Sequence, residues 1–338
     1  MAHIAVLGSG GWGTALAVLA HREGHTVSLW SPFQEELDAI RRDGEHKKLL
    51  PGVPVSPSIA LTTDIGCTAD TDLTLLVVPS FAIAQTAEKL RGVLPAGALI
   101  ANAGKGIESR TRRRFTEILA DTLPGTRIVA LSGPSHAEEV GRGVPTSVVS
   151  ACTDVCAAEE VQDLLMCPTF RIYTSTDVIG VELGGALKNV IALAAGICDG
   201  LRMGDNTKAA VMTRGLSEIA RLGVAMGARQ ETFAGMSGMG DLMVTCGSMH
   251  SRNRRAGILI GEGVPPEEAI RRIGTVEGYL ATATAWSLAQ ETGVEMPITE
   301  QCYRICYENV PPRKALEALL SRGKRHEWDQ PWLSADRS

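Results

Sequence analysis

The chain has 338 residues, is 44% hydrophobic and 21% charged, and carries a formal net charge of -5. Its length accommodates two domains of about 100–200 residues each. The acidic balance excludes a sequence-independent nucleic-acid surface, which needs a surplus of lysine and arginine facing phosphates.

No segment of the sequence indicates secretion, membrane insertion or metal binding. The first residues, HIAVLG, read as a strand rather than a signal segment, and no apolar stretch approaches the roughly 20 residues of a membrane span. The eight cysteines include no C-x-x-C pair and no histidine at zinc spacing, so we expect reduced thiols and no metal site. We therefore place the protein in the cytoplasm.

The first half of the chain alternates short aliphatic or β-branched runs with helical segments. The runs lie at 3–7, 26–30, 73–78, 97–103, 127–133, 145–151 and 170–174. This alternation predicts an α/β domain of Rossmann type, a doubly wound and mostly parallel sheet with helices on both faces. From Val178 the pattern is helical throughout, so an all-α domain follows. We place the domains at residues 1–176 and 177–332 and expect a loosely ordered tail from about Arg322.

A glycine loop follows the first expected strand. Gly8, Gly10 and Gly13 have the G-x-G-x-x-G spacing and stand between that strand and a helix. Gly8 allows the tight turn, Gly10 lets a pyrophosphate approach the backbone, and Gly13 lets the helix pack close to the strand. This context predicts a dinucleotide site. The alternative is a glycine-rich turn without a ligand.

The second expected strand ends at Trp30-Ser31-Pro32, where an acidic residue would indicate NAD and an arginine NADP. Neither is present. Ser31 can donate a hydrogen bond to either cofactor, and Arg41 and Arg42 read as solvated helix charges. The residues leave the choice between NAD and NADP open, with a slight preference for NAD because no cation is fixed there.

Two further strands end in polar residues on the side where such sheets bind ligands. Lys105 lies between two glycines after the strand at 97–103, and Gly133 and Ser135 follow the strand at 127–133. A surface lysine is the plain alternative for Lys105.

The helix that opens the second half, VELGGALKNVIALAAG, carries a lysine and an asparagine in an apolar segment. At 100° per residue, Gly184, Ala192 and Ala195 lie on the side of Lys188, which predicts a space into which the ammonium projects. Alternatively, Lys188 is buried and paired with a carboxylate such as Asp199 or Asp241.

A later segment, GMSGMGDLMVTCGSMHSRNRRAG, gathers polar groups near helix starts. Asp241 and Thr245 enter one helical turn, and Ser251, Arg252 and Asn253 offer hydroxyl, guanidinium and amide donors in another. Arginine binds phosphate bidentately, so this second turn predicts a phosphate clamp. A solvated basic turn is the alternative.

These stretches together resemble the bacterial NAD(P)-dependent glycerol-3-phosphate dehydrogenases over nearly the whole chain. The resemblance rests on GSGGWGTALA, VVPS, GKGIE, LSGPS, GVELGGALKNVIALAAGICDGL, GDNTKAAVMTRGLSEIARLG, GMGDLMVTCGSMHSRNRRAG and TVEGYLAT. It implies interconversion of dihydroxyacetone phosphate and sn-glycerol 3-phosphate, mainly feeding phospholipid synthesis, by a homodimer that uses NAD or NADP. It also implies that Lys188 is the catalytic acid/base, with Lys105, Asp241 and Asn189 beside it.

The candidate substrate contacts, with Thr245 added from its own turn, are Lys105, Gly133, Ser135, Lys188, Asp241, Thr245, Ser251, Arg252 and Asn253. The candidate cofactor contacts, with Ser31 added from its place after the second strand, are Gly8, Gly10, Gly11, Trp12, Gly13, Ser31, Lys105, Ala137, Arg252, Val276 and Glu277. We expect Asp241 and Asn189 to orient Lys188, and burial beside Lys105 and Arg252 to lower its pKa toward the working pH.

Three positions depart from the pattern of the family. Pro32 replaces an arginine, Leu49 replaces a tyrosine and His136 replaces a phenylalanine. We expect His136 to pack. Two other functions stay open: a β-hydroxyacid dehydrogenase, whose substrate ends in a carboxylate, and a redox-sensing dinucleotide-binding regulator without turnover.

Overall fold

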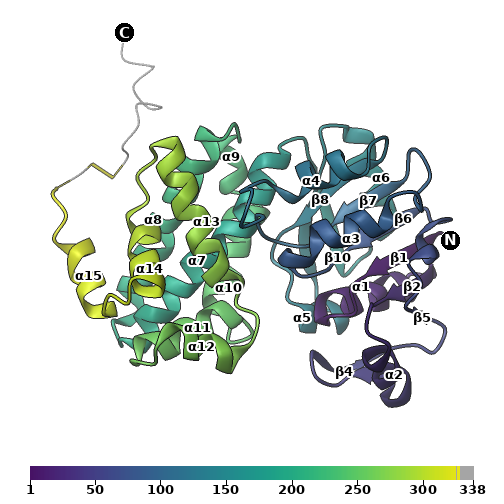
Figure 1. Ribbon diagram of the computed structural model, residues 1–338, viewed down its shortest axis with the longest axis horizontal. Coiled ribbons are helices and arrows are strands. Elements are labelled where there is room, and N and C mark those ends of the chain that lie inside the picture. Colours follow the sequence, from purple (N-terminus) through teal and green to yellow (C-terminus); the bar gives the residue numbers. More distant parts are fainter. Residues whose placement is uncertain (325, 328–338) are drawn as a thin grey trace, which may run out of the picture.

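The computed structural model describes residues 1–324, 326 and 327, which form two lobes (Figure 1). The sheet lobe runs to the end of β10 at Ser175, and the helical lobe begins with α7 at Val178. The predicted order, a Rossmann-type sheet followed by helices, is therefore observed. The tail expected from Arg322 falls mostly on residue 325 and residues 328–338, which lie outside the described residues.

The sheet has eight strands in the order β10-β9-β8-β7-β6-β1-β2-β5, and all seven predicted strands are in it. Every pair is parallel except β8 with β9. The bounds are β1 His3–Leu7, β2 Thr26–Trp30, β5 Ala60–Thr62, β6 Leu73–Leu76, β7 Leu99–Asn102, β8 Arg127–Ser132, β9 Thr146–Ala151 and β10 Phe170–Ser175. The strand β5 and the hairpin β3 (Glu45–His46) with β4 (Leu50–Pro54) were missed. The strands β3 and β5 are too short to show an alternation, and β4 contains two prolines and a glycine, which are depleted in strands.

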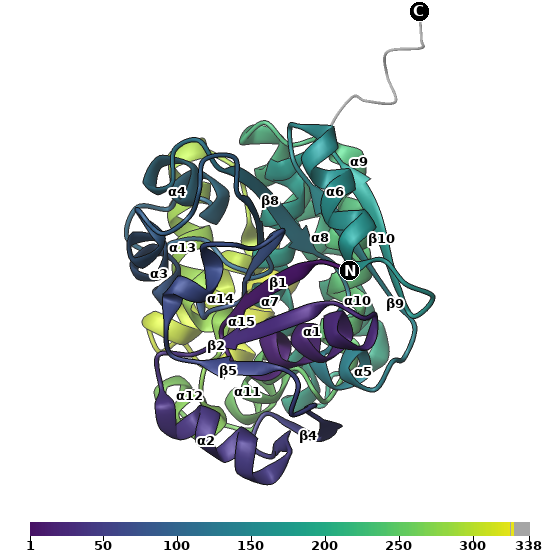
Figure 2. The same cartoon turned by 90° about the vertical axis from the view of Figure 1, so that its right-hand side faces the viewer.

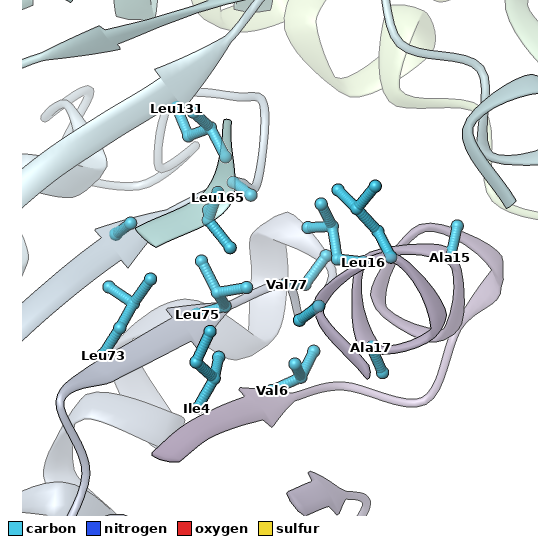
Figure 3. Packing of buried hydrophobic residues seen from close by; sticks show 14 of the residues in the cluster. Ile4, Val6, Ala15, Leu16, Ala17, Leu73, Leu75, Val77, Leu131 and Leu165 are labelled. Atoms are coloured by element: carbon cyan, nitrogen blue, oxygen red, sulfur yellow. The ribbon is translucent and has the colours of Figure 1, made fainter. Parts of the chain in front are cut away.

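Successive strand residues point to opposite faces of the sheet, and helices cover both faces (Figure 2). Ile4 and Val6 belong to one apolar cluster, and Leu7 belongs to another. The first cluster packs under α1 (Gly11–Arg22), α5 (Ala137–Gly141) and α6 (Val155–Leu165), and Figure 3 shows α1 residues such as Leu16 facing Val77 and the strands. The second packs under α3 (Ile83–Leu90) and α4 (Phe115–Thr122). The lobe also contains α2 (Gln34–Asp43) and two short 3-10 helices, η1 (Ile65–Thr68) and η2 (Ser80–Ala82).

The helical lobe is built around α7 (Val178–Gly200), whose residues 180 to 198 are all buried. Asp177 caps this helix, because its Oδ1 accepts a hydrogen bond from the backbone N–H of Gly180 at 2.9 Å. The other helices are α8 Gly204–Ala225, α9 Gln230–Phe233, the π-helical turn η3 Met236–Gly240, α10 Asp241–Gly247, α11 Arg252–Gly261, α12 Pro266–Ile273, α13 Glu277–Thr292, α14 Pro297–Tyr307 and α15 Pro312–Leu320.

The expectation that no apolar stretch reaches the length of a membrane span was wrong. By length and composition alone α7 could cross a bilayer, with 23 residues and a mean hydropathy of 1.6 in its most apolar window. However, 89% of that window is buried inside the protein. Its apolar residues therefore meet protein rather than lipid, as in the central helix of a folded core.

Glycines let α7 and α11 approach until their backbones touch. A Cβ added at Gly196 would lie 2.1 Å from the carbonyl oxygen of Arg254, and one at Gly257 would lie 2.2 Å from that of Leu193. Both distances are far below van der Waals contact, so neither position admits a larger residue without a backbone shift. This close packing sets the start of α11 beside the middle of α7.

We predict that Gly196→Ala lowers the free energy of unfolding by about 1–3 kcal/mol, the cost of overpacking a rigid core. The matched control is Gly247→Ala in α10, where the added Cβ would meet no atom within 4 Å. Urea unfolding followed by far-UV circular dichroism measures both. Equal midpoints for the two variants would contradict the role of Gly196.

Candidate active site

Lys188 is buried in the middle of α7, with 5% of its surface exposed. Its Nζ donates hydrogen bonds to Oδ1 of Asp241 and, at 2.8 Å, to Oγ1 of Thr245. Thr245 in turn donates to the backbone carbonyl of Asp241 at 2.6 Å. The lysine is therefore paired, as a buried ammonium must be.

Asp241 also holds a second lysine, which comes from the sheet lobe. Lys105 follows β7, and its Nζ lies 2.8 Å from Oδ2 of Asp241. The same Nζ donates to the carbonyl of Gly133 at 2.7 Å and to Oγ of Ser135 at 3.3 Å. One carboxylate thus joins two ammonium groups across the lobes. When both lysines are protonated the trio carries one net positive charge, which favours an anionic or developing negative ligand.

The surroundings of Lys188 bring the pKa of its amine close to neutral pH. Burial lowers the pKa of the Lys188 amine to about 7, Asp241 opposes this fall by attracting the charged form, and Lys105 adds to it by repulsion. An amine with this pKa can gain and lose a proton at neutral pH, which is what general acid–base catalysis needs.

A glycine brings Asp241 to the lysine. A Cβ at Gly184 would lie 2.6 Å from the carbonyl oxygen of Ser237, so the absence of a side chain lets the η3 turn press against α7. That turn leads directly into Asp241, and π-helical turns of this kind are frequent at functional sites.

The sequence had predicted open space on this face of α7, and that prediction was wrong. The η3 turn fills the position beside Gly184, while Ala192 and Ala195 are fully buried in the helical core. The small residues serve close packing, not an open pocket. Of the two carboxylates considered as partners, Asp241 binds the lysine, whereas Asp199 pairs with Arg254 at 2.7 Å.

The Ser-Arg-Asn turn forms the start of α11. Ser251 caps the helix, accepting a hydrogen bond from the backbone N–H of Arg254 at 3.2 Å. Arg252 is the first helical residue and is exposed. Asn253 is buried and donates to Oδ1 of Asn189 at 2.8 Å.

Asn189 does not contact Lys188 in the hydrogen bonds of the described residues, contrary to the expected orienting role. Its partner is Asn253, whose Oδ1 accepts from the backbone N–H of Gly278 at 2.8 Å. This chain of amides ties α7, α11 and α13 together beside the lysine. Thr245, rather than Asn189, makes the second contact with the Lys188 amine.

The turn after β8 borders the two lysines. Gly133 has a φ of 139° and presents its carbonyl to Lys105, and Ser135 donates to that same carbonyl at 3.0 Å. His136 follows, and its ring lies 5.7 Å from the ring of His250. Burial, and secondly the charge of Lys188, lowers the pKa of His136, which keeps its imidazole neutral at neutral pH. Ala137 begins α5 beside it.

The glycine loop after β1 has the shape that a dinucleotide pyrophosphate requires. A Cβ at Gly13 would lie 1.8 Å from the carbonyl oxygen of Gly8, so α1 packs directly on the turn, and Gly8 has a φ of 120°. A Cβ at Gly10 would meet nothing within 4 Å, which leaves its backbone open to a ligand. The N-terminus of α1 adds backbone donors and a favourable dipole for phosphate.

The β3–β4 hairpin and β10 both approach the start of α1. A Cβ at Gly11 would lie 2.6 Å from the carbonyl oxygen of Leu49, so the β3–β4 hairpin packs directly against the start of α1. Trp12 is partly buried, with its ring 6.5 Å from that of Phe170.

A contact that sequence reasoning missed links the lobes at the start of α13. Val276 is buried there, and the Glu277 carboxylate accepts hydrogen bonds from the side chain and backbone of Ser80, which follows β6. Burial raises the pKa of Glu277, and these hydrogen bonds and the charge of Arg252 oppose the rise. The VVPS segment that carries Ser80 gave no chemical signal of its own, because serine after a strand is common in loops.

All eight cysteines are free, and the described residues contain no group of three or more histidine, cysteine, aspartate and glutamate side chains that could hold a metal ion. Burial raises the pKa of buried thiols such as Cys246, to about 12.

A Rossmann-type sheet with a dinucleotide loop, facing a helical lobe that supplies a buried lysine, defines an NAD(P)-dependent dehydrogenase. Comparison with known proteins gives the family. The family models for the N-terminus and C-terminus of NAD-dependent glycerol-3-phosphate dehydrogenase match residues 3–158 and 177–317. The chain therefore belongs to the glycerol-3-phosphate dehydrogenase family, as the sequence motifs had indicated.

Individual relatives match over almost their whole length. The chain is 49% identical to a glycerol-3-phosphate dehydrogenase (NAD(P)+) of Desulfitobacterium hafniense, over 99% of this chain and 96% of that protein. It is 52% identical to the enzyme of that name from Moorella thermoacetica, over 96% and 97%. The crystal structure of glycerol-3-phosphate dehydrogenase from Coxiella burnetii superposes with a TM-score of 0.91 at 39% identity, covering 95% of this chain and 99% of that one.

Proposed function

We propose that this chain reduces dihydroxyacetone phosphate to sn-glycerol 3-phosphate with NADH or NADPH, and catalyses the reverse reaction, mainly supplying phospholipid synthesis. The observation that carries this proposal is the trio of Lys188, Asp241 and Lys105 at the junction of the lobes. The homologues named glycerol-3-phosphate dehydrogenase support the substrate pair.

Lys188 acts as the acid of the reduction and the base of the oxidation. The bound reduced nicotinamide supplies a hydride for C2 of the substrate. As C2 becomes tetrahedral, negative charge grows on its oxygen, and Lys188 donates a proton to that oxygen to give the hydroxyl. A pKa of about 7 makes the amine a competent donor at neutral pH.

Asp241 positions both lysines and limits the fall in the pKa of Lys188. Each of its two carboxylate oxygens accepts a hydrogen bond from one ammonium, and Thr245 accepts a second hydrogen bond from the Lys188 amine. Because Lys105 keeps part of its side chain exposed, it can turn a donor toward the substrate while Asp241 retains another. Preorganised charges of this kind stabilise a developing oxyanion without reorganisation during the reaction.

The substrate phosphate binds at the start of α11. Arg252 is exposed there and can form a bidentate ion pair, and the helix N-terminus adds backbone donors and a favourable dipole. Asn253 uses one amide hydrogen on Asn189 and keeps the other for a phosphate oxygen, and Ser251 is adjacent. Gly133 and Ser135 lie next to the end of the substrate that carries no phosphate.

Residues at the carboxyl edge of the sheet would hold the cofactor. The pyrophosphate would be held by Gly8, Gly10, Gly11, Trp12 and Gly13. The nicotinamide would be bordered by Ala137, Val276, Glu277, Lys105 and Arg252. In this assignment residues 1–176 bind the dinucleotide and residues 177–332 bind the substrate, with residue 325 and residues 328–332 outside the described part. The protein works as a cytoplasmic homodimer on small molecules.

The activity is tested by the fall in absorbance at 340 nm when dihydroxyacetone phosphate is added to the protein with NADH or NADPH. We expect a rapid fall with at least one cofactor, and a much slower one with unphosphorylated dihydroxyacetone because the phosphate contacts are lost. A 3-oxo acid tests the alternative function, since a β-hydroxyacid dehydrogenase reduces the 3-oxo group of a substrate that ends in a carboxylate. Cofactor binding without turnover of any substrate would instead support a sensor.

We predict that Lys188→Ala lowers kcat/KM for dihydroxyacetone phosphate by about 100–10,000-fold while dinucleotide binding persists, because the proton donor is lost. The matched control is Lys314→Ala on an exposed turn of α15, which should retain full activity. Steady-state kinetics with fluorescence titration of NADH measures both. A Lys188→Ala enzyme within tenfold of the parent would remove the assignment.

The pH dependence of the two reaction directions tests the same lysine. Reduction needs the protonated amine, so kcat/KM for dihydroxyacetone phosphate should be constant below about pH 7 and fall above it, following the pKa of Lys188. Oxidation of sn-glycerol 3-phosphate needs the neutral amine and should rise through the same range. Profiles with the same slope in both directions would contradict an acid/base lysine.

A further inference from the structure

A second charged cluster lies beside the dinucleotide loop, in the first turn of α2. Oε2 of Glu36 accepts hydrogen bonds from the hydroxyls of Ser9 and Ser31, the latter at 3.0 Å. Oε1 of Glu36 lies 3.3 Å from Nε2 of His46. Ser9, Ser31 and His46 are buried, whereas 30% of the Glu36 side chain is exposed. The carboxylate is thus held by buried groups, while the side chain as a whole keeps part of its surface exposed.

The cluster keeps Glu36 ionised. The pKa of Glu36 is lowered to about 2, mainly by its contact with the imidazole of His46 and further by the hydroxyls of Ser9 and Ser31. Burial acts in the opposite direction and raises the pKa. The carboxylate is therefore negative throughout the pH range in which the enzyme works. It acts as a fixed acceptor and not as a switch.

Its position along the sheet is the one where dinucleotide-binding folds read the adenosine ribose. Ser9 is the second residue of the glycine loop after β1, and Ser31 directly follows β2, the parallel neighbour of β1. An acidic side chain at this edge hydrogen-bonds the ribose 2′-hydroxyl of NAD, while an arginine accommodates the 2′-phosphate of NADP. The carboxylate comes from α2 and folds back, so the residue directly after the strand does not reveal it.

Both arginines of α2 are paired with carboxylates of the same helix. Arg41 pairs with Asp38 at 2.6 Å, and Arg42 pairs with Asp43 at 3.1 Å. Pro32, directly after Ser31, carries no charge. The first turn of α2 contains Glu35 and Glu36, which place negative charge where the helix N-terminus would otherwise favour a phosphate. A 2′-phosphate would meet a carboxylate here, whereas a ribose hydroxyl would meet an acceptor.

We propose that Glu36 is the residue that makes this chain select NAD over NADP, by accepting hydrogen bonds from the ribose hydroxyls and repelling a 2′-phosphate. The inference rests on the proposed dehydrogenase function and specifies its cofactor. It also accounts for the missing arginine at position 32: the chain has no 2′-phosphate to bind.

The ratio of kcat/KM for NADH to that for NADPH, with dihydroxyacetone phosphate as substrate, tests the proposal. We expect the parent to favour NADH at least tenfold and Glu36→Gln to reduce this ratio at least fivefold, mainly through better use of NADPH. Glu35→Gln is the matched control, because Glu35 lies in the same turn and is exposed. It should leave the ratio within twofold of the parent.

Binding measured without turnover separates this proposal from the catalytic one. Calorimetry with ADP-ribose and with its 2′-phosphorylated form reports the ribose contact even if no substrate is reduced. The parent should bind ADP-ribose at least tenfold more tightly than the 2′-phosphorylated form, and Glu36→Gln should reduce this ratio of affinities at least fivefold. A parent without this preference, a smaller change in Glu36→Gln, or an equal change in Glu35→Gln would overturn the assignment. If Glu36→Gln does not fold, a parent that binds both ligands equally well still overturns the assignment.

Discussion

The carboxylate of Asp241 is the contact on which the site depends. It binds an ammonium from α7 and another from the loop after β7, so it joins the helical lobe to the sheet lobe at the proposed point of reaction. A buried lysine costs several kcal/mol without a partner. Asp241 attracts the charged form of the Lys188 amine, and Lys105 repels it. Lys188 therefore has a charge partner and can still lose its proton at neutral pH.

Backbone packing makes this contact possible. Gly184 lets the η3 turn approach α7 closely enough to deliver Asp241, and Gly196 and Gly257 let α11 lie against the same helix. The polar turn at the start of α11 is thereby held near Lys188. The glycines of α7 therefore set the positions of the proposed catalytic groups through backbone packing. Rigid, close-packed helices fix side chains more accurately than loops could.

The sequence predicted the sheet, the glycine loop and the polar residues, because strand alternation and G-x-G-x-x-G spacing are local signals. It predicted the partners of Lys188 only in part: Asp241 contacts the lysine as expected, whereas Asn189 contacts Asn253 instead. Whether Lys188 paired with Asp199 or Asp241 depended on how three helices cross, and the small residues beside it suggested an empty space that close packing has in fact filled. Glu36 was missed for the same reason: its carboxylate reaches the ribose edge through folding, from a helix that looked solvated.

The most direct test of this account is the proton affinity of Lys188 itself, measured by NMR titration of protein labelled with ¹³C at the lysine ε carbon. Lys188→Ala assigns the resonance by its disappearance. We expect one lysine to titrate near pH 7 in the free enzyme, well below the ordinary value of about 10.4. In Asp241→Asn the pKa should fall further, because the carboxylate favours the charged amine. If every lysine titrates above about pH 9, or if Asp241→Asn raises the pKa, the acid/base account is contradicted.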